Sequence, residues 1–244
     1  LHQAMYEFLV SRGFIVVALD HSFDANLTIF PDGHLADYRS NITGHPDSLN
    51  VRTMQMNTRV ADISFILDQL DKIQSGKIES QINAKIDLER VAVGGHSYGG
   101  STATVVSQRD NRIKACFSLD SWISPIPQET IDDGIHIPFL FMGRPTWDGS
   151  DYPGNYPRLD SLMAHSSNPK YRLIIKGTKH LDYSDIPLFS PIIGYVLDVG
   201  SNPAALTVSL INELVHGFLV KHLLGESNDI FDNAIDNDLV YQIQ

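Results

Sequence analysis

The sequence predicts an α/β domain in which a mostly parallel β-sheet is covered by helices on both faces. Short continuous apolar runs, typical of strands buried on both sides, alternate with longer segments of helical periodicity. One of these runs breaks into a glycine-rich turn that opens a helix, as expected where a parallel strand feeds a helix. The chain has 244 residues, 43% of them hydrophobic, which is enough for a large core. Without an internal repeat or a linker, we expect a single domain over residues 1–244.

The expected elements alternate along the chain. A helix opens it, with apolar residues from Leu1 to Leu9, and ends near Gly13, a typical left-handed cap. Strands are expected at residues 14–19, 90–93, 113–119, 138–142 and 171–176. Helices are expected at residues 53–73, 99–108 and 156–165, and from Asn202-Pro203 to Gly225. Residues 22–50 indicate a long polar loop, and the acidic tail after Gly225 a loosely packed, solvated end.

Charge and cysteine content narrow the class of protein. The net charge of -11 disfavours binding to nucleic acids and to anionic membranes. No stretch approaches the ~18 consecutive apolar residues of a membrane span, so we expect a soluble chain without stable membrane insertion. The single cysteine, Cys116, lies inside an apolar run, which predicts a buried structural thiol and no internal disulfide. Compartment and oligomeric state are left open.

The candidate nucleophile lies in the turn Gly95-His96-Ser97-Tyr98-Gly99. Gly-x-Ser-x-Gly between a strand and a helix is the nucleophile elbow of α/β-hydrolases, where glycines avoid collisions at the chain reversal. Ser97 would stand exposed above the sheet edge, and the backbone N–H of Tyr98, at the positive end of the helix, can hold an oxyanion. The alternative is a glycine-rich turn with an incidental serine.

A serine nucleophile needs a base, and ten histidines compete for that role. In α/β-hydrolases the acid and the histidine follow the serine, each in a loop after a later strand. His180 comes three residues after Gly177, where the last expected strand ends. His96 lies inside the elbow and is expected to point away from Ser97. The other histidines precede the serine, precede a strand or lie on helices, so His180 is the candidate base.

The acid has two candidate positions. Asp120 directly follows the strand expected at residues 113–119, and Asp148 or Asp151 follows the next one. Each lies in a loop at the carboxyl edge of the sheet, so spacing alone leaves the choice open. Without a catalytic role, Asp120 would be a helix cap or turn residue and Asp148 a turn aspartate before glycine.

A resemblance favours Asp120. The chain resembles the plasma and intracellular type II platelet-activating-factor acetylhydrolases, which are α/β-hydrolases, in three stretches: Gly95-His96-Ser97-Tyr98-Gly99-Gly100, Ser118-Leu119-Asp120-Ser121-Trp122 and Gly177-Thr178-Lys179-His180. The resemblance extends over nearly the whole chain and implies a triad of Ser97, His180 and Asp120. It implies hydrolysis of short-chain acyl esters, including platelet-activating-factor-like or oxidised phospholipids, without a metal or cofactor.

One feature departs from that family. Its second oxyanion donor comes from a His-Gly-type loop after a strand that precedes the first helix, and this chain starts at that helix. We therefore expect the first strands and the oxyanion loop upstream of residue 1, or a substitute donor in the long loop. Two alternatives stay open: another acyl hydrolase or peptidase on the same fold, and a binding module that keeps the triad residues but lacks the second donor.

Overall fold

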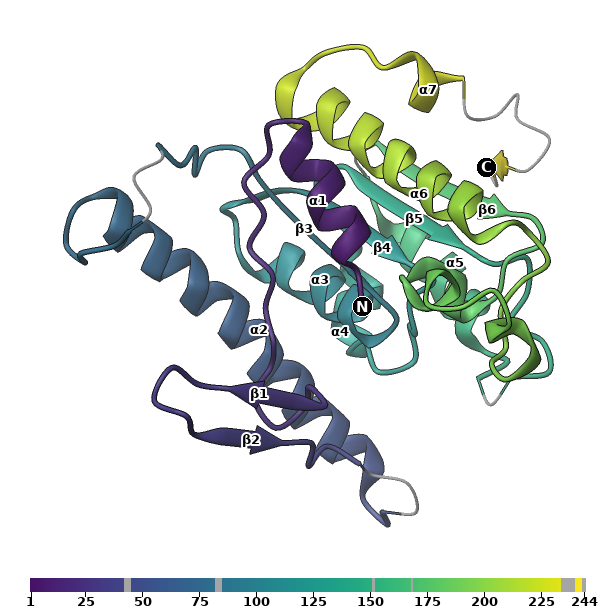
Figure 1. The fold of residues 1–244 in the computed structure, drawn as a ribbon, viewed down its shortest axis with the longest axis horizontal. Coiled ribbons are helices and arrows are strands. Elements are labelled where there is room, and N and C mark those ends of the chain that lie inside the picture. The colour runs from purple at the N-terminus through teal and green to yellow at the C-terminus, as the bar shows by residue number, and fades with distance from the viewer. Residues whose placement is uncertain (42–44, 82–84, 151, 168, 234–239, 243–244) are drawn as a thin grey trace. The chain divides into compact units, whose positions relative to one another are not determined.

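The structure is a computed structural model that describes residues 1–41, 45–81, 85–150, 152–167, 169–233 and 240–242 (Figure 1). Its contacts group the chain into two compact units. The larger unit contains residues 1–16 and 87–244, and the smaller contains residues 17–86. The single domain expected from the sequence therefore stays a prediction.

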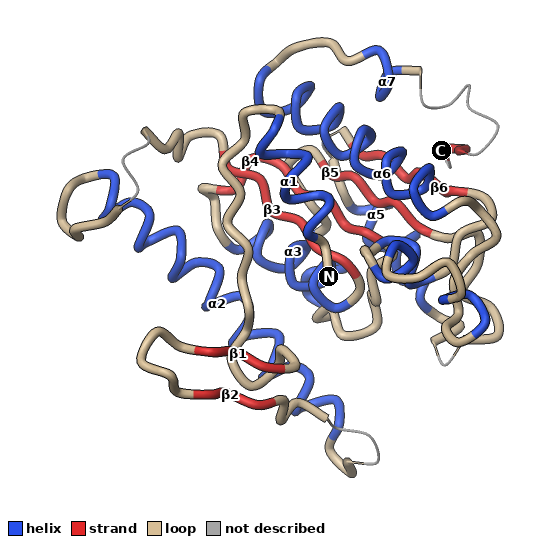
Figure 2. Tube along the Cα trace, in the orientation of Figure 1, coloured by secondary structure: helices blue, strands red, loops and turns tan. Residues whose placement is uncertain are grey.

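The larger unit is built on a five-stranded sheet in the order β3-β4-β5-β6-β7 (Figure 2). Its parallel strands are β3 (Val91–His96), β4 (Ile113–Leu119), β5 (Phe139–Gly143) and β6 (Lys170–Ile175), and the edge strand β7 (Val240–Gln242) runs antiparallel to β6. All four parallel strands form where apolar runs predicted them. Because they are parallel and adjacent, the loops that follow them meet at one edge of the sheet.

Helices cover both faces of this sheet. Leu140 and Met142 of β5 share a buried cluster with α1 (Gln3–Ser11) and α6 (Ala204–Leu219). Phe141 points to the opposite face, where its ring contacts Tyr156 of α5 (Asn155–His165). Two further helices, α3 (Tyr98–Arg109) and the short α4 (Gln128–Asp133), complete the strand-to-helix alternation.

The last long helix is a core element. After α6, Val220–Leu224 continues as a π-helical turn and ends at Gly225, which has a φ of 73°. Within the described residues, the combined helix Ala204–Leu224 is long and apolar enough to cross a membrane by length and composition. However, its buried residues, including Leu214, Val215 and Phe218, belong to the core cluster on the sheet. The apolar composition of this helix is therefore explained by its packing against the sheet.

The expectations for residues 14–19 and for the acidic tail were wrong. Residues 14–19 form no strand: they have no ladder partner among the described residues, and Ile15 is 52% exposed. An apolar run needs a neighbouring strand before it can join a sheet. The acidic tail is not simply solvated either, because it forms α7 (Asp229–Asp232) and β7, which bury Phe231 and Val240 in the core cluster.

The smaller unit combines a hairpin with a long helix. Strands β1 (Leu27–Ile29) and β2 (Leu35–Asp37) pair antiparallel around a turn at Gly33, whose φ is 84°. Residues 22–50 were expected to form a loop. The hairpin was not predicted, because each of its strands has only three residues. Helix α2 (Ser48–Gln74) contains the segment predicted at residues 53–73. His21 Nδ1 lies 2.8 Å from Asp62 Oδ2, which ties the segment before the hairpin to α2.

Candidate active site

The elbow between β3 and α3 holds Ser97 in a strained backbone conformation, with a φ of 57°. Gly95 and Gly100 have no room for a side chain: a Cβ would lie 2.5 Å from the Gly99 carbonyl carbon at the first and 1.8 Å from Ser121 Oγ at the second. Gly99, in contrast, faces open space. Two glycines are therefore required by packing, while the last glycine of the Gly-x-Ser-x-Gly pattern is not.

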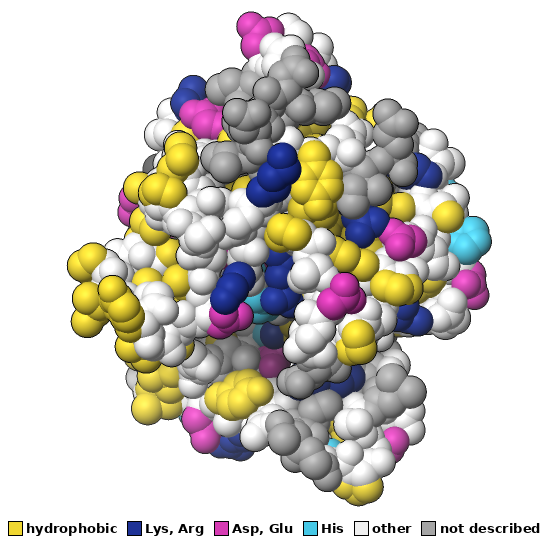
Figure 3. Space-filling view, turned by 90° about the vertical axis from the view of Figure 1, so that its right-hand side faces the viewer, with side chains coloured by type: hydrophobic (Ala, Val, Ile, Leu, Met, Phe, Trp, Pro, Cys, Tyr) yellow, Lys and Arg dark blue, Asp and Glu magenta, His cyan; other side chains and the backbone are white. Residues whose placement is uncertain are grey.

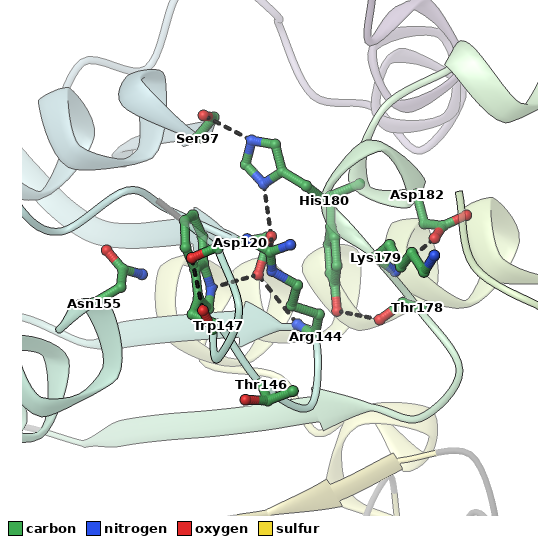
Figure 4. A network of polar contacts seen from close by, with 12 residues as sticks. Ser97, Asp120, Arg144, Thr146, Trp147, Asn155, Thr178, Lys179, His180 and Asp182 are labelled. Carbon is green, nitrogen blue, oxygen red and sulfur yellow. Dashed lines mark hydrogen bonds and ion pairs between the residues drawn. The ribbon is translucent and has the colours of Figure 1, made fainter. Parts of the chain in front are cut away.

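The structure brings Ser97, His180 and Asp120 together in one hydrogen-bonded chain (Figure 4). His180 Nε2 lies 2.9 Å from Ser97 Oγ, and His180 Nδ1 lies 2.7 Å from Asp120 Oδ2. Because a carboxylate only accepts, His180 carries its proton on Nδ1, and Nε2 is free to accept the Ser97 proton. The three side chains come from the loops that follow β3, β4 and β6.

Of the competing acid candidates, Asp148 does not join this chain. Asp148 is exposed, and its backbone N–H donates to Thr146 Oγ1 in a local turn. That is the turn role considered for Asp148 in the sequence analysis. Asp151 lies outside the described residues. At His180 the structure therefore places the carboxylate of Asp120.

Asp120 is completely buried and is surrounded by donors from the loop after β5. Its Oδ1 accepts the Arg144 backbone N–H and the Trp147 Nε1–H, both at 3.2 Å. The Arg144 guanidinium lies over the Trp147 ring, with its central carbon 3.9 Å from the ring centroid. Arg144 Nε is 3.2 Å from Asp120 Oδ2. Sequence reasoning missed both side chains, although their loop was the alternative location for the acid.

His96 lies directly against the candidate base, a contact that the sequence analysis did not anticipate. Its ring centroid is 4.5 Å from that of His180, and its Nε2 donates to the His180 carbonyl oxygen at 2.9 Å. Burial lowers the pKa of His96 well below its usual value, and the nearby His180 contributes. His96 is therefore a neutral donor that supports the backbone of the His180 loop.

The His180 loop is also fixed from its other side. Asp182 Oδ2 accepts the backbone N–H of Lys179 at 2.7 Å and that of Gly200 at 2.6 Å. Burial raises the pKa of Asp182, while these two donors lower it. In addition, Thr178 Oγ1 and Tyr183 Oη lie 3.1 Å apart. The short helix His180–Tyr183 is thus held by His96 on one side and by Asp182 and Thr178 on the other. Figure 4 shows Asp182, Lys179 and Thr178 beside His180.

Comparison with known proteins gives the family. The family model described as platelet-activating factor acetylhydrolase, isoform II, matches residues 1–239. The chain belongs to this family. Individual proteins are also similar to this chain. The platelet-activating factor acetylhydrolase of Canis lupus familiaris is 27% identical to it, over 93% of this chain and 55% of the relative.

A second relative is the probable 1-alkyl-2-acetylglycerophosphocholine esterase of Arthroderma benhamiae, 23% identical over 94% of this chain and 59% of its own length. The chain spans little more than half the length of the curated relatives it matches. Among solved structures, a ferulic acid esterase from Streptomyces cinnamoneus has a TM-score of 0.79 at 23% identity, covering 100% of this chain and 69% of that one. This likeness confirms the predicted α/β-hydrolase fold.

The surroundings of Ser97 in this acetylhydrolase family member are aromatic. Tyr98 is the first residue of α3, where backbone N–H groups point out of the helix end. Its ring centroid is 5.8 Å from that of Trp122, which in turn lies 4.6 Å from that of Tyr152. The Trp122 backbone N–H donates to the Ser97 carbonyl oxygen at 3.3 Å, so this row of aromatic rings starts at the nucleophile.

Proposed function

We propose that this chain carries the catalytic centre of a serine carboxylester hydrolase. Ser97 is the nucleophile, His180 the general base and then acid, and Asp120 the residue that orients His180. The observation that carries the proposal is the hydrogen-bonded chain from Ser97 Oγ through His180 to the buried Asp120, built on a strained elbow. Backbone strain at a serine beside a base is typical of an active site.

The reaction proceeds by acyl transfer in two halves. Ser97 Oγ attacks the ester carbonyl carbon while its proton moves to His180 Nε2, and the developing oxyanion lies at the N-terminus of α3 near the Tyr98 N–H. His180 then gives the proton to the leaving alcohol, which leaves an acyl-enzyme. Water repeats the sequence and releases the acid.

The proposed substrates are short-chain acyl esters, with platelet-activating-factor-like or oxidised phospholipids as the preferred class. The names of the relatives support this class. Exposed apolar side chains also follow the His180 loop, including Phe189, Ile192, Tyr195 and Val196. The space-filling view shows hydrophobic side chains exposed among charged ones on the face that it presents (Figure 3). Such a surface suits an ester with an apolar chain.

The test is a pre-steady-state assay with p-nitrophenyl acetate. We expect a burst of p-nitrophenol equal to the enzyme concentration, unaffected by chelators and absent in Ser97→Ala. Hydrolysis that persists in Ser97→Ala would contradict the assignment of the nucleophile. Cleavage of peptide anilides but not of esters would instead indicate a peptidase, and binding without turnover would indicate a binding module.

Substrate class is tested with phosphatidylcholines that differ only in the acyl group at the second glycerol carbon. We expect acetyl and short oxidised chains to be hydrolysed, with kcat/KM falling as the chain lengthens towards palmitoyl. Equal rates for all chain lengths would contradict the preference for short acyl groups without affecting the nucleophile assignment.

A further inference from the structure

A largely enclosed cation, Arg144, lies at the carboxylate of the proposed triad. The Arg144 side chain is only 15% exposed, and its Nε is 3.2 Å from Asp120 Oδ2. The same oxygen faces His180 Nδ1 at 2.7 Å. One carboxylate oxygen is therefore shared between the candidate base and a guanidinium.

Acyl transfer by a serine does not need this cation. The orienting carboxylate only has to accept from the imidazole, and Asp120 Oδ1 already has two neutral donors, the Arg144 backbone N–H and Trp147 Nε1–H. A buried guanidinium also loses hydration, which disfavours it unless its interactions compensate. Here the compensation comes from Asp120 and from the face of Trp147.

We propose that Arg144 is a positioning residue that sets the pH range in which His180 works as a base. The inference rests on the proposed function of the same site. A fixed positive charge on the shared oxygen weakens the attraction between Asp120 and a protonated His180, and it repels the imidazolium directly. Both effects favour the neutral imidazole, so the enzyme stays active at lower pH than a triad without the cation.

The other ionisable groups around His180 do not supply a fixed positive charge beside it. Asp120 is the partner already described, and burial lowers the pKa of both His96 and His2, whose rings lie in a row with that of His180. Burial raises the pKa of Tyr156 and Tyr183, so both stay neutral. The Lys179 ammonium is half exposed and pairs with Asp198. Arg144, in contrast, is only 15% exposed and permanently charged.

The loop that carries Arg144 has anchors that do not use its side chain. The Tyr156 hydroxyl donates to the Arg144 carbonyl oxygen, and Trp147 Nε1–H donates to Asp120. Replacing the guanidinium therefore removes the charge and leaves these hydrogen bonds in place. This makes Arg144→Met, of similar length and without charge, the informative variant, and Arg144→Lys its charge-preserving counterpart.

The experiment is the pH profile of kcat/KM for p-nitrophenyl acetate between pH 4.5 and 9, in the intact protein. For Arg144→Met we expect the acid limb to move to higher pH by about one unit, so that the activity on that limb falls about tenfold while the plateau changes little. Arg144→Lys should keep the wild-type limb. The matched control is Arg172→Met, because Arg172 is a buried guanidinium that pairs with Asp160 and lies over the Tyr156 ring. It should leave the limb unchanged.

An unmoved limb in Arg144→Met, with kcat reduced by the same factor at every pH, would overturn the inference and indicate a purely structural role. A second readout does not depend on turnover: the titration of the His180 imidazole followed by NMR, assigned with His180→Gln. The same upward shift in Arg144→Met supports the inference even if ester hydrolysis is absent. A burst that survives in Ser97→Ala would contradict the proposed function while leaving this titration interpretable.

Discussion

Individual residues of the site adopt backbone conformations that side chains normally avoid. Among the described residues, the non-glycine residues with positive φ are Phe23, Ser97 and Asp120, the latter two at 57° and 37°. Their neighbours hold both in place: the Ser97 N–H donates to the Leu119 carbonyl at 3.0 Å, and the Asp120 N–H to the Met142 carbonyl at 2.6 Å. Strain that the sheet edge compensates is thus concentrated on the proposed nucleophile and on its acid.

The choice between the two carboxylates is testable at this scale. In Asp120→Asn the amide cannot hold the His180 tautomer that accepts from Ser97, so we expect kcat to fall by a factor on the order of 10⁴. Asp148→Asn is the matched control, because Asp148 is exposed and only its backbone takes part in a described hydrogen bond. Its kcat should stay within twofold. Steady-state kinetics on both variants checks this, and a large loss in Asp148→Asn alone would reverse the assignment.

At the scale of the element, the close packing of the elbow requires glycine at a few positions. α3 begins so close to β4 that Gly100 lies against Ser118 and Ser121. The hydroxyls of these two serines hydrogen-bond each other beneath the turn. The glycines of this motif are therefore not equally required by packing. Gly95 and Gly100 permit a close approach of the chain, whereas a Cβ added at Gly99 would meet no atom within 4 Å.

This difference predicts opposite effects for two neighbouring substitutions. Gly100→Ala should lower the free energy of unfolding by about 1–3 kcal/mol or more, because its Cβ would lie 1.8 Å from Ser121 Oγ and 2.8 Å from the Gly95 carbonyl oxygen. Gly99→Ala, in open space within the first turn of α3, should be neutral or stabilise by up to about 1 kcal/mol. Urea unfolding of both variants measures this. Equal losses would show that the close approach is not what requires glycine.

At the scale of the whole molecule, the C-terminal segment completes the larger unit. Phe231 of α7 lies against Tyr171 of β6 and Phe218 of α6, with ring centroids 5.0 and 5.9 Å apart. β7 pairs with β6 and so covers what would otherwise be an exposed strand edge. A tail that is acidic in composition is thus held by one aromatic side chain and one edge strand.

We therefore expect Phe231→Ala to destabilise the protein by about 3–5 kcal/mol, since it removes a side chain that is 5% exposed from the core. Phe189→Ala is the matched control: Phe189 is 65% exposed, and its loss should change stability by less than about 0.5 kcal/mol. Thermal and urea unfolding of the two variants gives the comparison. Similar stability of both would mean that the tail contributes little to the core.

The sequence by itself determined the parallel strands, the order of the loops and the candidate nucleophile and base. Buried strands leave continuous apolar runs, and the elbow has a local glycine pattern, so both can be seen without knowing what packs where. The choice of Asp120 over Asp148 was open on spacing alone and was favoured only through a resemblance.

The contact of the His96 ring with His180 and the position of the Arg144 guanidinium at Asp120 were decided by the tertiary structure. The same holds for residues 14–19, which are apolar enough for a strand but have no described partner, and for the docked tail. The physical reason is common to all of them: each depends on a contact between segments far apart in the chain, and local sequence patterns carry no information about such contacts.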